Sequence, residues 1–547
     1  MKSMIEANHG SCFNEGPFLL PFSLYPAAMS LRLSTSAGRI LLTGSFGCAM
    51  TVLDTNVVGI ILPTVARDLG ASFSQIEWVV SSYVLCFAAL LLPAGATADR
   101  YGRRRVLLGG IALFALTSLA CALAPSAQAL YGARALQGVG AAFLLAPALA
   151  VIGHGFHDED QRERAWALWG GIMGLTMVLA PLIGGVVNTL LGWRWAFAVN
   201  LPACLLLAVA VWRHVPESRN PLPRPLDPLG ILSSSSAVFL LTWALITGPE
   251  HGWTSVACVA RGLGGALLLV LFIAWQRRAA HPMLELSLFR HAGFVAAVAA
   301  MFAYAASAQV MASLLPLFLQ NARGLSAWQT GLAMLPFALA MLLLPQVGSR
   351  LARWLSSPQM LALGLGVTAL GNLLMIQAAL SGAAAWTALG MAVLGSGGGL
   401  LNGQTQKAIM GNVPRERAGM ASGISTTARF TGVLAGFAGL GAVLADTARH
   451  AMQNALAALD ASASAAAFVE RAMAGDLAQA AALLPQHGQA AVMLARQAYA
   501  QGFAHAFAAA ALLAVATALL VLWSIRRTAR PAARPGAAAR LRRPPGA

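Results

Sequence analysis

The chain has 547 residues, of which 58% are hydrophobic and 10% are charged, and its mean hydropathy is +0.69. Because a soluble protein normally has about 25% charged residues, this composition leaves too few polar side chains to cover a surface in water. The net charge of +17 does not indicate nucleic-acid binding, since the basic residues stand between apolar segments and not on one face. The composition predicts a polytopic helical membrane protein.

Residue usage argues against two further classes. Lys2 and Lys407 are the only lysines, and neither stands in the glycine-rich pattern of a P-loop, which excludes ATP hydrolysis by that route. The six cysteines form no CxxC pair. We therefore expect no metal site, no disulfide framework and no cofactor.

Fourteen apolar runs long enough to cross a bilayer follow an N-terminal tail at 1–38, which we expect to be disordered. The runs lie at about 39–64, 76–97, 105–124, 130–152, 165–190, 196–212, 229–248, 256–275, 292–319, 329–347, 359–380, 384–408, 418–445 and 503–524. Basic residues concentrate in alternate connections, which predicts that both termini are cytoplasmic. A long outer loop of partly helical structure is predicted at 446–502, and a basic disordered tail that contacts anionic lipid at 525–547.

Two segments repeat at an offset of 253 residues. Pro93–Arg100 corresponds to Gln346–Arg353, and Glu163-Arg-Ala165 corresponds to Glu416-Arg-Ala418. Chance similarity between Gly/Ala-rich segments is the alternative, although two loops share the offset. The repeat predicts two six-helix bundles, at 39–212 and 292–524, joined by a linker at 213–291 that contains two extra spans. Parallel repeats of this kind are typical of secondary transporters.

Four motifs lie in the first bundle. The hairpin after the second run contains Gly95, Asp99, Arg100, Gly102, Arg103, Arg104 and Arg105. The first run contains Leu53-Asp54-Thr55 and Leu62-Pro63, and the fourth run contains Arg134, Gln137 and Gly138. The fifth run contains Gly174, Ala180, Pro181, Gly184 and Gly185, and Trp193-Arg194-Trp195 follows it. Together they resemble the major facilitator superfamily, and specifically its fourteen-span drug:proton antiporter branch. Ala180 departs from that pattern, which has Gly before Pro.

The resemblance implies a role for three of these motifs. It implies that helices 1 and 4 share a cavity in which Arg134 serves proton coupling. It implies that Asp99 and Arg103 dock at the start of the run at 418–445, so that Gly95, Asp99, Arg100, Gly102, Arg103 and Arg104 form a cytoplasmic gate. It implies that the motif of Gly174, Pro181, Gly184 and Gly185 seals the fifth helix against proton leak. Close helix packing alone would explain the same glycines.

Asp54 is the one carboxylate that lies well within an apolar run. An intramembrane acid is costly and usually functional, which favours a role in handling protons or substrate. Arg134 enters the membrane from the opposite direction and reaches an overlapping depth, so we expect it to be the counter-charge, with Gln137 in the same network. The alternatives are an Asp54 that is permanently hydrogen-bonded to a neighbouring helix, and an Arg134 that extends to the outer headgroups.

The second bundle does not repeat these groups. Ala352 stands at the position of Asp99 by the offset of 253. Gly138-Val-Gly140 corresponds to Gly395-Ser-Gly397 at a similar offset of 257, by which Met391 and Leu394 stand at the positions of Arg134 and Gln137. It offers Asn402, Gln404 and Arg429 as candidates for a substrate cavity. Arg429 lies within its run and needs a partner or water.

The sequence thus predicts a proton-driven exporter of hydrophobic or cationic small molecules that works by alternating access in a bacterial inner membrane. A proton-coupled symporter that imports a metabolite is the alternative. An enzyme is not expected, since no HExxH or GxSxG motif is present. The expected partners are the lipid bilayer, protons and a small-molecule substrate; a periplasmic adaptor protein is left open.

Overall fold

The computed structural model describes residues 36–156, 159–219, 227–279, 282, 286–413, 418–457, 462–473, 475, 477–484 and 488–528. Within these residues the chain is helical and has no strand, and fourteen helices are long and apolar enough to cross a membrane. This confirms the predicted all-α polytopic fold. The predicted tails lie outside the described residues, except for 36–38 and 525–528, which continue the first and last helices.

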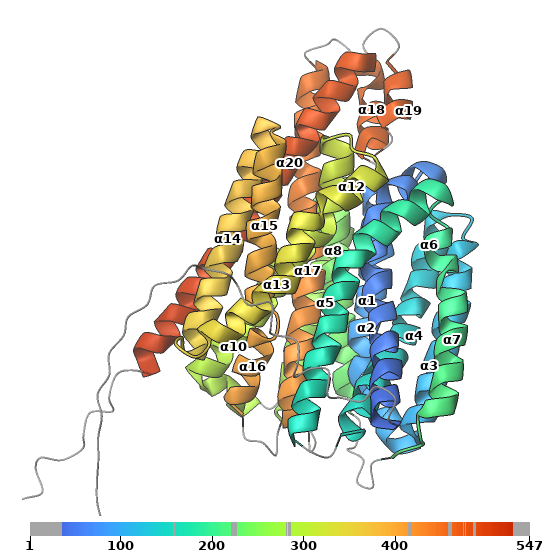
Figure 1. Ribbon diagram of the computed structural model, residues 1–547. Coiled ribbons are helices and arrows are strands. Elements are labelled where there is room, and N and C mark those ends of the chain that lie inside the picture. Colours follow the sequence, from blue (N-terminus) through green and yellow to red (C-terminus); the bar gives the residue numbers. More distant parts are fainter. Residues whose placement is uncertain are drawn as a thin grey trace, which may run out of the picture.

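The first six spans form one bundle (Figure 1). Its elements are α1 (Ser36–Leu69), α2 (Phe73–Tyr101), α3 (Arg103–Ala122), α4 (Ala127–His154), α5 (Glu159–Leu190), α6 (Trp195–Ala198) and α7 (Asn200–His214). Helix α4 packs against α1, α2 and α3, and α1 also packs against α5. The sixth span is divided into α6 and α7 at Val199.

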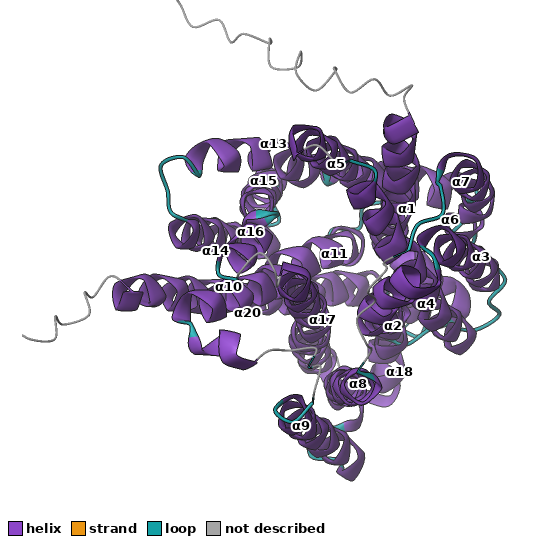
Figure 2. Cartoon of the chain, turned by 90° about the horizontal axis from the view of Figure 1, so that it is seen from below, coloured by secondary structure: helices purple, strands orange, loops and turns teal. Residues whose placement is uncertain are grey.

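The next two spans, α8 (Pro228–His251) and α9 (Val256–Gln276), form a hairpin at the edge of the molecule (Figure 2). Helix α8 packs against α2 and α17, whereas α9 packs on α8. Only 11% of the most apolar stretch of α9 is buried, so this helix presents most of its apolar surface outward.

The remaining spans form the second bundle. Its elements are η2 (Leu286–Arg290), α10 (Ala292–Tyr304), η3 (Ala305–Gln309), α11 (Val310–Leu317), η4 (Phe318–Ala322), α12 (Ala327–Ala333), α13 (Leu335–Leu351), α14 (Ser357–Ser381), α15 (Ala384–Leu401), α16 (Gln404–Gly411), α17 (Ala418–Ala457), α18 (Ser462–Met473), α19 (Leu477–Ala482) and α20 (Gly488–Thr528).

Two spans of this bundle are interrupted where hydrophobicity alone predicts continuous helices. The ninth span contains two π-helical turns, η3 and η4, a form that is frequent at functional sites. The twelfth span breaks between α15 and α16 at Asn402 and Gly403, where Gly403 adopts a φ of 84°. Glycine reaches this conformation without steric cost, which allows the break inside the membrane region.

The predicted loop at 446–502 is largely helical and shorter than expected, because α17 continues to Ala457 and α20 begins at Gly488. Between them, α18 and α19 form a cap that projects beyond the bundle, at the top of Figure 1. The Tyr499 hydroxyl on α20 lies 2.9 Å and 2.6 Å from the carbonyl oxygens of Ala472 and Met473, to which it donates. The alanine-rich composition favours helix, and this anchor holds the cap against α20.

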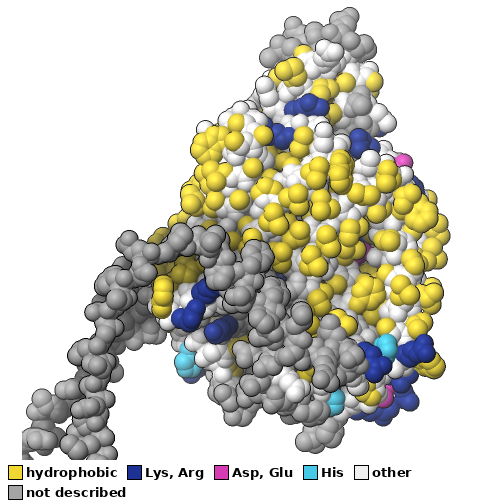
Figure 3. Space-filling model, in the orientation of Figure 1, with side chains coloured by type: hydrophobic (Ala, Val, Ile, Leu, Met, Phe, Trp, Pro, Cys, Tyr) yellow, Lys and Arg dark blue, Asp and Glu magenta, His cyan; other side chains and the backbone are white. Residues whose placement is uncertain are grey.

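The outer surface agrees with a multi-pass membrane protein. Hydrophobic side chains cover the flank of the bundle in Figure 3, and basic side chains gather towards its two ends. Large exposed apolar residues include Leu206, Leu263 and Leu267, at 59% to 68% exposure. Such a surface would be unfavourable in water and is suited to lipid.

Candidate functional site

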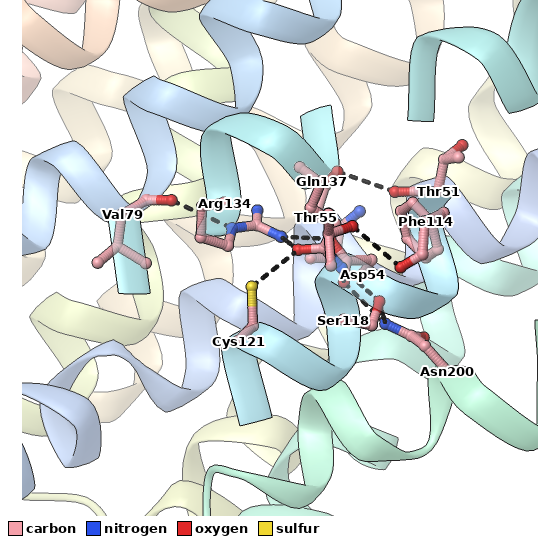
Figure 4. Close-up of polar contacts among 12 residues, drawn as sticks. Thr51, Asp54, Thr55, Val79, Phe114, Ser118, Cys121, Arg134, Gln137 and Asn200 are labelled. Carbon is pink, nitrogen blue, oxygen red and sulfur yellow. Dashed lines mark hydrogen bonds and ion pairs between the residues drawn. The ribbon is translucent and has the colours of Figure 1, made fainter. Parts of the chain in front are cut away.

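Asp54 on α1 and Arg134 on α4 form a buried ion pair. The Arg134 Nη1 atom lies 2.6 Å from Asp54 Oδ2, and each side chain is 1% exposed. The sequence placed these groups at similar depths, and the structure brings them into contact (Figure 4). Arg134 therefore does not extend to the outer headgroups.

Gln137, one turn after Arg134, joins both members of the pair. Its Nε2 donates to Asp54 Oδ1 over 3.0 Å, and its Oε1 accepts from Arg134 Nη1 over 2.6 Å. The same Nε2 lies 2.8 Å from the Ser118 hydroxyl on α3. The three residues that the sequence singled out form one closed hydrogen-bonded network.

Asn200 completes this network and was missed by the sequence reasoning. Its Nδ2 donates to Asp54 Oδ1 over 3.0 Å and lies 3.4 Å from the Ser118 hydroxyl. Asn200 is the first residue of α7, directly after the break at Val199. The sequence does show an isolated amide side chain within an apolar run, but whether this side chain faces Asp54 depends on how α7 packs.

Aromatic rings and a main-chain carbonyl enclose the rest of the Arg134 side chain. The guanidinium carbon lies 4.0 Å from the centre of the Tyr83 ring and 5.7 Å from that of Phe197, and Nε donates to the Val79 carbonyl over 3.2 Å. A guanidinium over an aromatic face is stabilised electrostatically when water is excluded. The Arg134 cation is thus contacted by two aromatic rings, a main-chain carbonyl and the Asp54 carboxylate.

The close approach of α2 to α4 depends on Gly138. A Cβ atom there would lie 2.3 Å from the Tyr83 carbonyl oxygen, which is shorter than real contacts allow. Tyr83 is the residue whose ring packs on Arg134. Gly138 therefore allows α2 to lie close enough to α4 for the Tyr83 ring to pack against Arg134.

The chemistry of this site follows from its burial. Asp54 accepts from Arg134, Gln137 and Asn200, so the ionised carboxylate is well satisfied. Removing one partner of a buried ion pair typically costs about 3–5 kcal/mol, because the other charge is left uncompensated. Loss of the negative charge on Asp54 would leave the Arg134 charge uncompensated in the same way.

The hairpin between α2 and α3 holds Asp99 against Arg103. Arg103 donates to Asp99 Oδ1 from Nε over 3.1 Å and from Nη2 over 2.9 Å. The predicted docking of this pair at the start of α17 lies outside what the structure describes, since residues 414–417 and the side chains of 418–423 are not included. Arg100 lies over the Tyr101 ring at 5.6 Å, and Gly95 faces Ala146.

Glu217, after α7, binds the beginning of α3 and was not anticipated. Its carboxylate accepts from the main-chain nitrogens of Arg104 and Arg105 over 3.1 and 3.3 Å. Gly102 has a φ of 115°, and a Cβ there would lie 2.6 Å from the Glu217 carboxylate. The glycine and the acid together form an N-terminal cap that fixes the hairpin.

The fifth-helix motif lies mainly where the two bundles meet. A Cβ atom at Gly185 would lie 2.8 Å from the Ala327 carbonyl oxygen of α12, and one at Gly174 would lie 2.8 Å from Leu342 of α13. The Pro181 carbonyl faces Gly331, whereas Gly184 faces Ile60 and Val57 on α1. These small residues let α5 contact the second bundle at van der Waals distance.

Residues 44–437 match the sequence profile of the Major Facilitator Superfamily. The chain belongs to this superfamily. The matched range covers the ion pair, the hairpin and the fifth-helix motif.

Several characterised superfamily proteins are similar in sequence. Multidrug resistance protein Stp of Mycobacterium tuberculosis (strain CDC 1551 / Oshkosh) is 37% identical over 74% of this chain and 75% of its own length. Multidrug efflux pump LfrA of Mycolicibacterium smegmatis is 33% identical over 75% of this chain and 82% of its own. The methylenomycin A resistance protein of Streptomyces coelicolor is 31% identical over 73% and 84%.

Solved structures share the superfamily fold at low sequence identity. An inward-facing bacterial homologue of the human lysosomal transporter Spinster aligns with a TM-score of 0.61 and 16% identity, over 90% of this chain and 98% of its own. A peptide transporter POT variant has a TM-score of 0.61 and 16% identity, over 89% and 95%. At this identity the likeness shows the fold alone.

In the second bundle of this superfamily member, Arg429 on α17 donates from Nε to Gln309 Oε1 over 3.1 Å. Gln309 ends the π-helical turn η3, so the arginine has the partner that its depth requires. Asn402 is exposed at the end of α15 and Gln404 is half-buried at the start of α16. Among the described residues, no hydrogen bond joins either amide to Arg429.

Groups that could hold a metal ion are absent from the described part of the chain, in which no three His, Cys, Asp or Glu side chains gather.

Proposed function

We propose that this chain is a secondary transporter that uses the proton gradient to export hydrophobic or cationic small molecules by alternating access. The observation that carries the proposal is the buried contact between Asp54 and Arg134, closed by Gln137. The similarity to a multidrug resistance protein, a multidrug efflux pump and a methylenomycin A resistance protein supports export of drug-like molecules.

In the proposed cycle Asp54 exchanges a proton and Arg134 responds to its charge. While Asp54 is ionised, the pair is neutral as a unit and stable in the packed bundle. When a proton from outside neutralises Asp54, the buried guanidinium loses its counter-charge and the packed arrangement loses stability. The protein then favours a conformation in which water reaches Arg134, so proton entry drives the change of access.

The contacts between the bundles support a state that is closed on one side. Gln320 Nε2 donates to the Ile60 carbonyl over 2.9 Å, and Gly185 packs against Ala327. Both contacts use the second halves of α1 and α5, near the side on which α1 ends. We propose that this is the extracytoplasmic gate and that both termini are cytoplasmic.

On the opposite side we propose a gate formed by the hairpin of Gly95, Asp99, Arg100, Gly102, Arg103 and Arg104. The Asp99–Arg103 pair and the Glu217 cap hold this hairpin in one conformation. We further propose that the fifth-helix contacts limit proton leak between the bundles. Asn402, Gln404 and Arg429 are the proposed polar contacts of the substrate.

The proposed partners are the lipid bilayer, protons and the exported molecule. A periplasmic adaptor protein would have to bind the cap formed by α18 and α19, because this part projects beyond the bundle (Figure 1). The protein acts as a transporter in this proposal, and no residue is given a catalytic role.

The decisive experiment uses proteoliposomes that contain the full-length protein and an imposed pH gradient, with ethidium as the transported cation. Antiport predicts that ethidium and protons move in opposite directions, and that Asp54→Asn abolishes both movements. Asp446→Asn, on α17 with a side chain that is 46% exposed, is the matched control and should transport normally. Ethidium movement in the same direction as the proton would instead establish the symporter. Normal gradient-driven transport by Asp54→Asn would remove Asp54 from the mechanism.

A further inference from the structure

A cavity of about 610 Å³ lies where α9 ends and η2 begins, and it is lined by Arg277, Leu286, Ser287 and Arg290. Its volume falls within the range of about 300–1,000 Å³ that is typical of small-molecule sites. We propose that this cavity binds the phosphate group of an anionic membrane lipid, in the leaflet on the side where α1 begins.

The two arginines supply the reason for an anion. In the part of the chain that the structure describes, neither the Arg277 nor the Arg290 guanidinium has a hydrogen-bond or ion-pair partner in the protein. Both side chains are exposed and line the same cavity. Two like charges that share a cavity repel each other, and a bound anion removes this repulsion. The planar guanidinium fork also matches two phosphate oxygens at once.

The position of Arg277 is fixed by a group of hydrogen bonds directly before it. The Asp227 carboxylate, at the start of α8, accepts from Trp275 Nε1 over 2.9 Å, from Gln276 Nε2 over 2.7 Å and from the Gly230 main-chain nitrogen over 2.9 Å. These bonds tie the last turn of α9 to α8. Among the described residues, Asp227 forms no ion pair with Arg277, so the hydrogen bonds position the end of α9 without neutralising this arginine.

The location of the cavity indicates a lipid in preference to a soluble anion. Helix α9 ends at Gln276 and α10 begins at Ala292, so the cavity lies at the ends of two candidate membrane spans, where a span meets the lipid headgroups. The adjacent α9 presents exposed leucines, such as Leu263 and Leu267, along which acyl chains can lie. Leu286 adds an apolar wall to the cavity. A lipid phosphate satisfies both the charged and the apolar parts, as in the basic pockets between helices that bind anionic headgroups.

The test measures lipid retention by the full-length protein in detergent with native mass spectrometry. The probes are dioctanoyl phosphatidylglycerol, dioctanoyl phosphatidylcholine and inorganic phosphate, each added separately. We expect phosphatidylglycerol to bind in preference to the other two. The double variant Arg277→Gln/Arg290→Gln should weaken its binding by on the order of tenfold or more, since each lost contact is a charge-assisted hydrogen bond.

A charge-matched control separates this site from general attraction to basic protein. Arg278→Gln/Arg353→Gln removes two exposed arginines that do not line the cavity and should leave binding unchanged. Equal losses in both double variants, or none in the first, would overturn the proposal. Binding of phosphatidylcholine as tight as that of phosphatidylglycerol would contradict the selectivity for an anionic lipid. Binding of inorganic phosphate, without binding of phosphatidylglycerol, would assign the cavity to a soluble anion. The single variants Arg277→Lys and Arg290→Lys keep the charge but not the fork, and an intermediate loss is expected from each.

Discussion

Asn200 and Gln137 donate to the same carboxylate oxygen, Asp54 Oδ1, over 3.0 Å each. The Asp54 carboxylate is thereby connected to α7 as well as to α4. A movement of α7 would change how well the carboxylate is satisfied, which links the ion pair to the packing of the sixth span.

Replacing Asn200 by alanine should weaken both stability and coupling. A hydrogen bond to a charged group contributes about 1.5–3 kcal/mol, so Asn200→Ala should lower the thermal unfolding temperature measurably. Transport driven by the pH gradient should fall in the same variant. Asn56→Ala is the control, because within the described part of the chain Asn56 donates only to the carbonyl of Val52 on its own helix. Equal effects of the two substitutions would show that Asn200 has no special relation to Asp54.

The ion pair itself gives a prediction about non-additivity. Asp54→Leu alone and Arg134→Met alone should each destabilise the protein by about 3–5 kcal/mol, because each leaves one buried charge. The double variant should be more stable than either single variant, since both charges are gone. It should nevertheless transport nothing against a gradient. Thermal unfolding of all four proteins in detergent tests the first expectation, and additive losses of stability would contradict it.

The span pattern was predictable from the sequence because crossing a bilayer requires a run of apolar residues of a set length. The contact between Asp54 and Arg134 was predictable for a similar reason. Depth in the membrane follows from counting residues along a helix, and few charges compete for partners there.

Features that depend on helix rotation and local backbone geometry were not predictable. Asn200 faces Asp54 only because α7 restarts after Val199 and packs on α1 and α3. The break at Gly403 and the π-helical turn that ends at Gln309 depend on local backbone geometry, which the hydrophobic pattern of their runs does not specify. The contact of Arg429 with Gln309 could therefore not be predicted by counting residues along regular helices. Glu217 binds α3 across more than a hundred residues of sequence, a contact that no local pattern predicts.

The packing of α2 on α4 leads to a prediction with a control on the same helix. Gly138→Ala should push α2 away, because the new methyl group would meet the Tyr83 carbonyl at 2.3 Å, and main-chain atoms cannot yield easily. Tyr83 would then lose its contact with Arg134, and transport should fall although both members of the ion pair remain. Gly132→Ala, also on α4, places its methyl group where no atom lies within 4 Å and should be tolerated. Gradient-driven ethidium transport and the unfolding temperature are the two measurements. A Gly138→Ala protein as active as Gly132→Ala would show that the close approach is not needed.

The hydrogen bonds at Asp227 predict how acid affects the α8–α9 hairpin. Burial raises the pKa of this carboxyl group, but donation from the Gly230 main chain, Trp275 and Gln276 outweighs burial and lowers the pKa below its usual value. A lowered pKa in the folded protein means that the ionised form contributes stability above the ordinary aspartate pKa of about 3.9. That contribution is lost as the pH falls through the lowered value.

The stability difference between the wild-type protein and Asp227→Asn should therefore be constant near neutral pH and shrink below about pH 4. Thermal unfolding of both proteins across this pH range is the measurement. Asp446→Asn is the control, because the Asp446 side chain is 46% exposed and its ion pair within the described chain is with His450, one turn along the same helix. A stability difference between the two proteins that grows on acidification would contradict this prediction. It would mean that the protonated carboxyl group, and not the carboxylate, is what Trp275 and Gln276 stabilise.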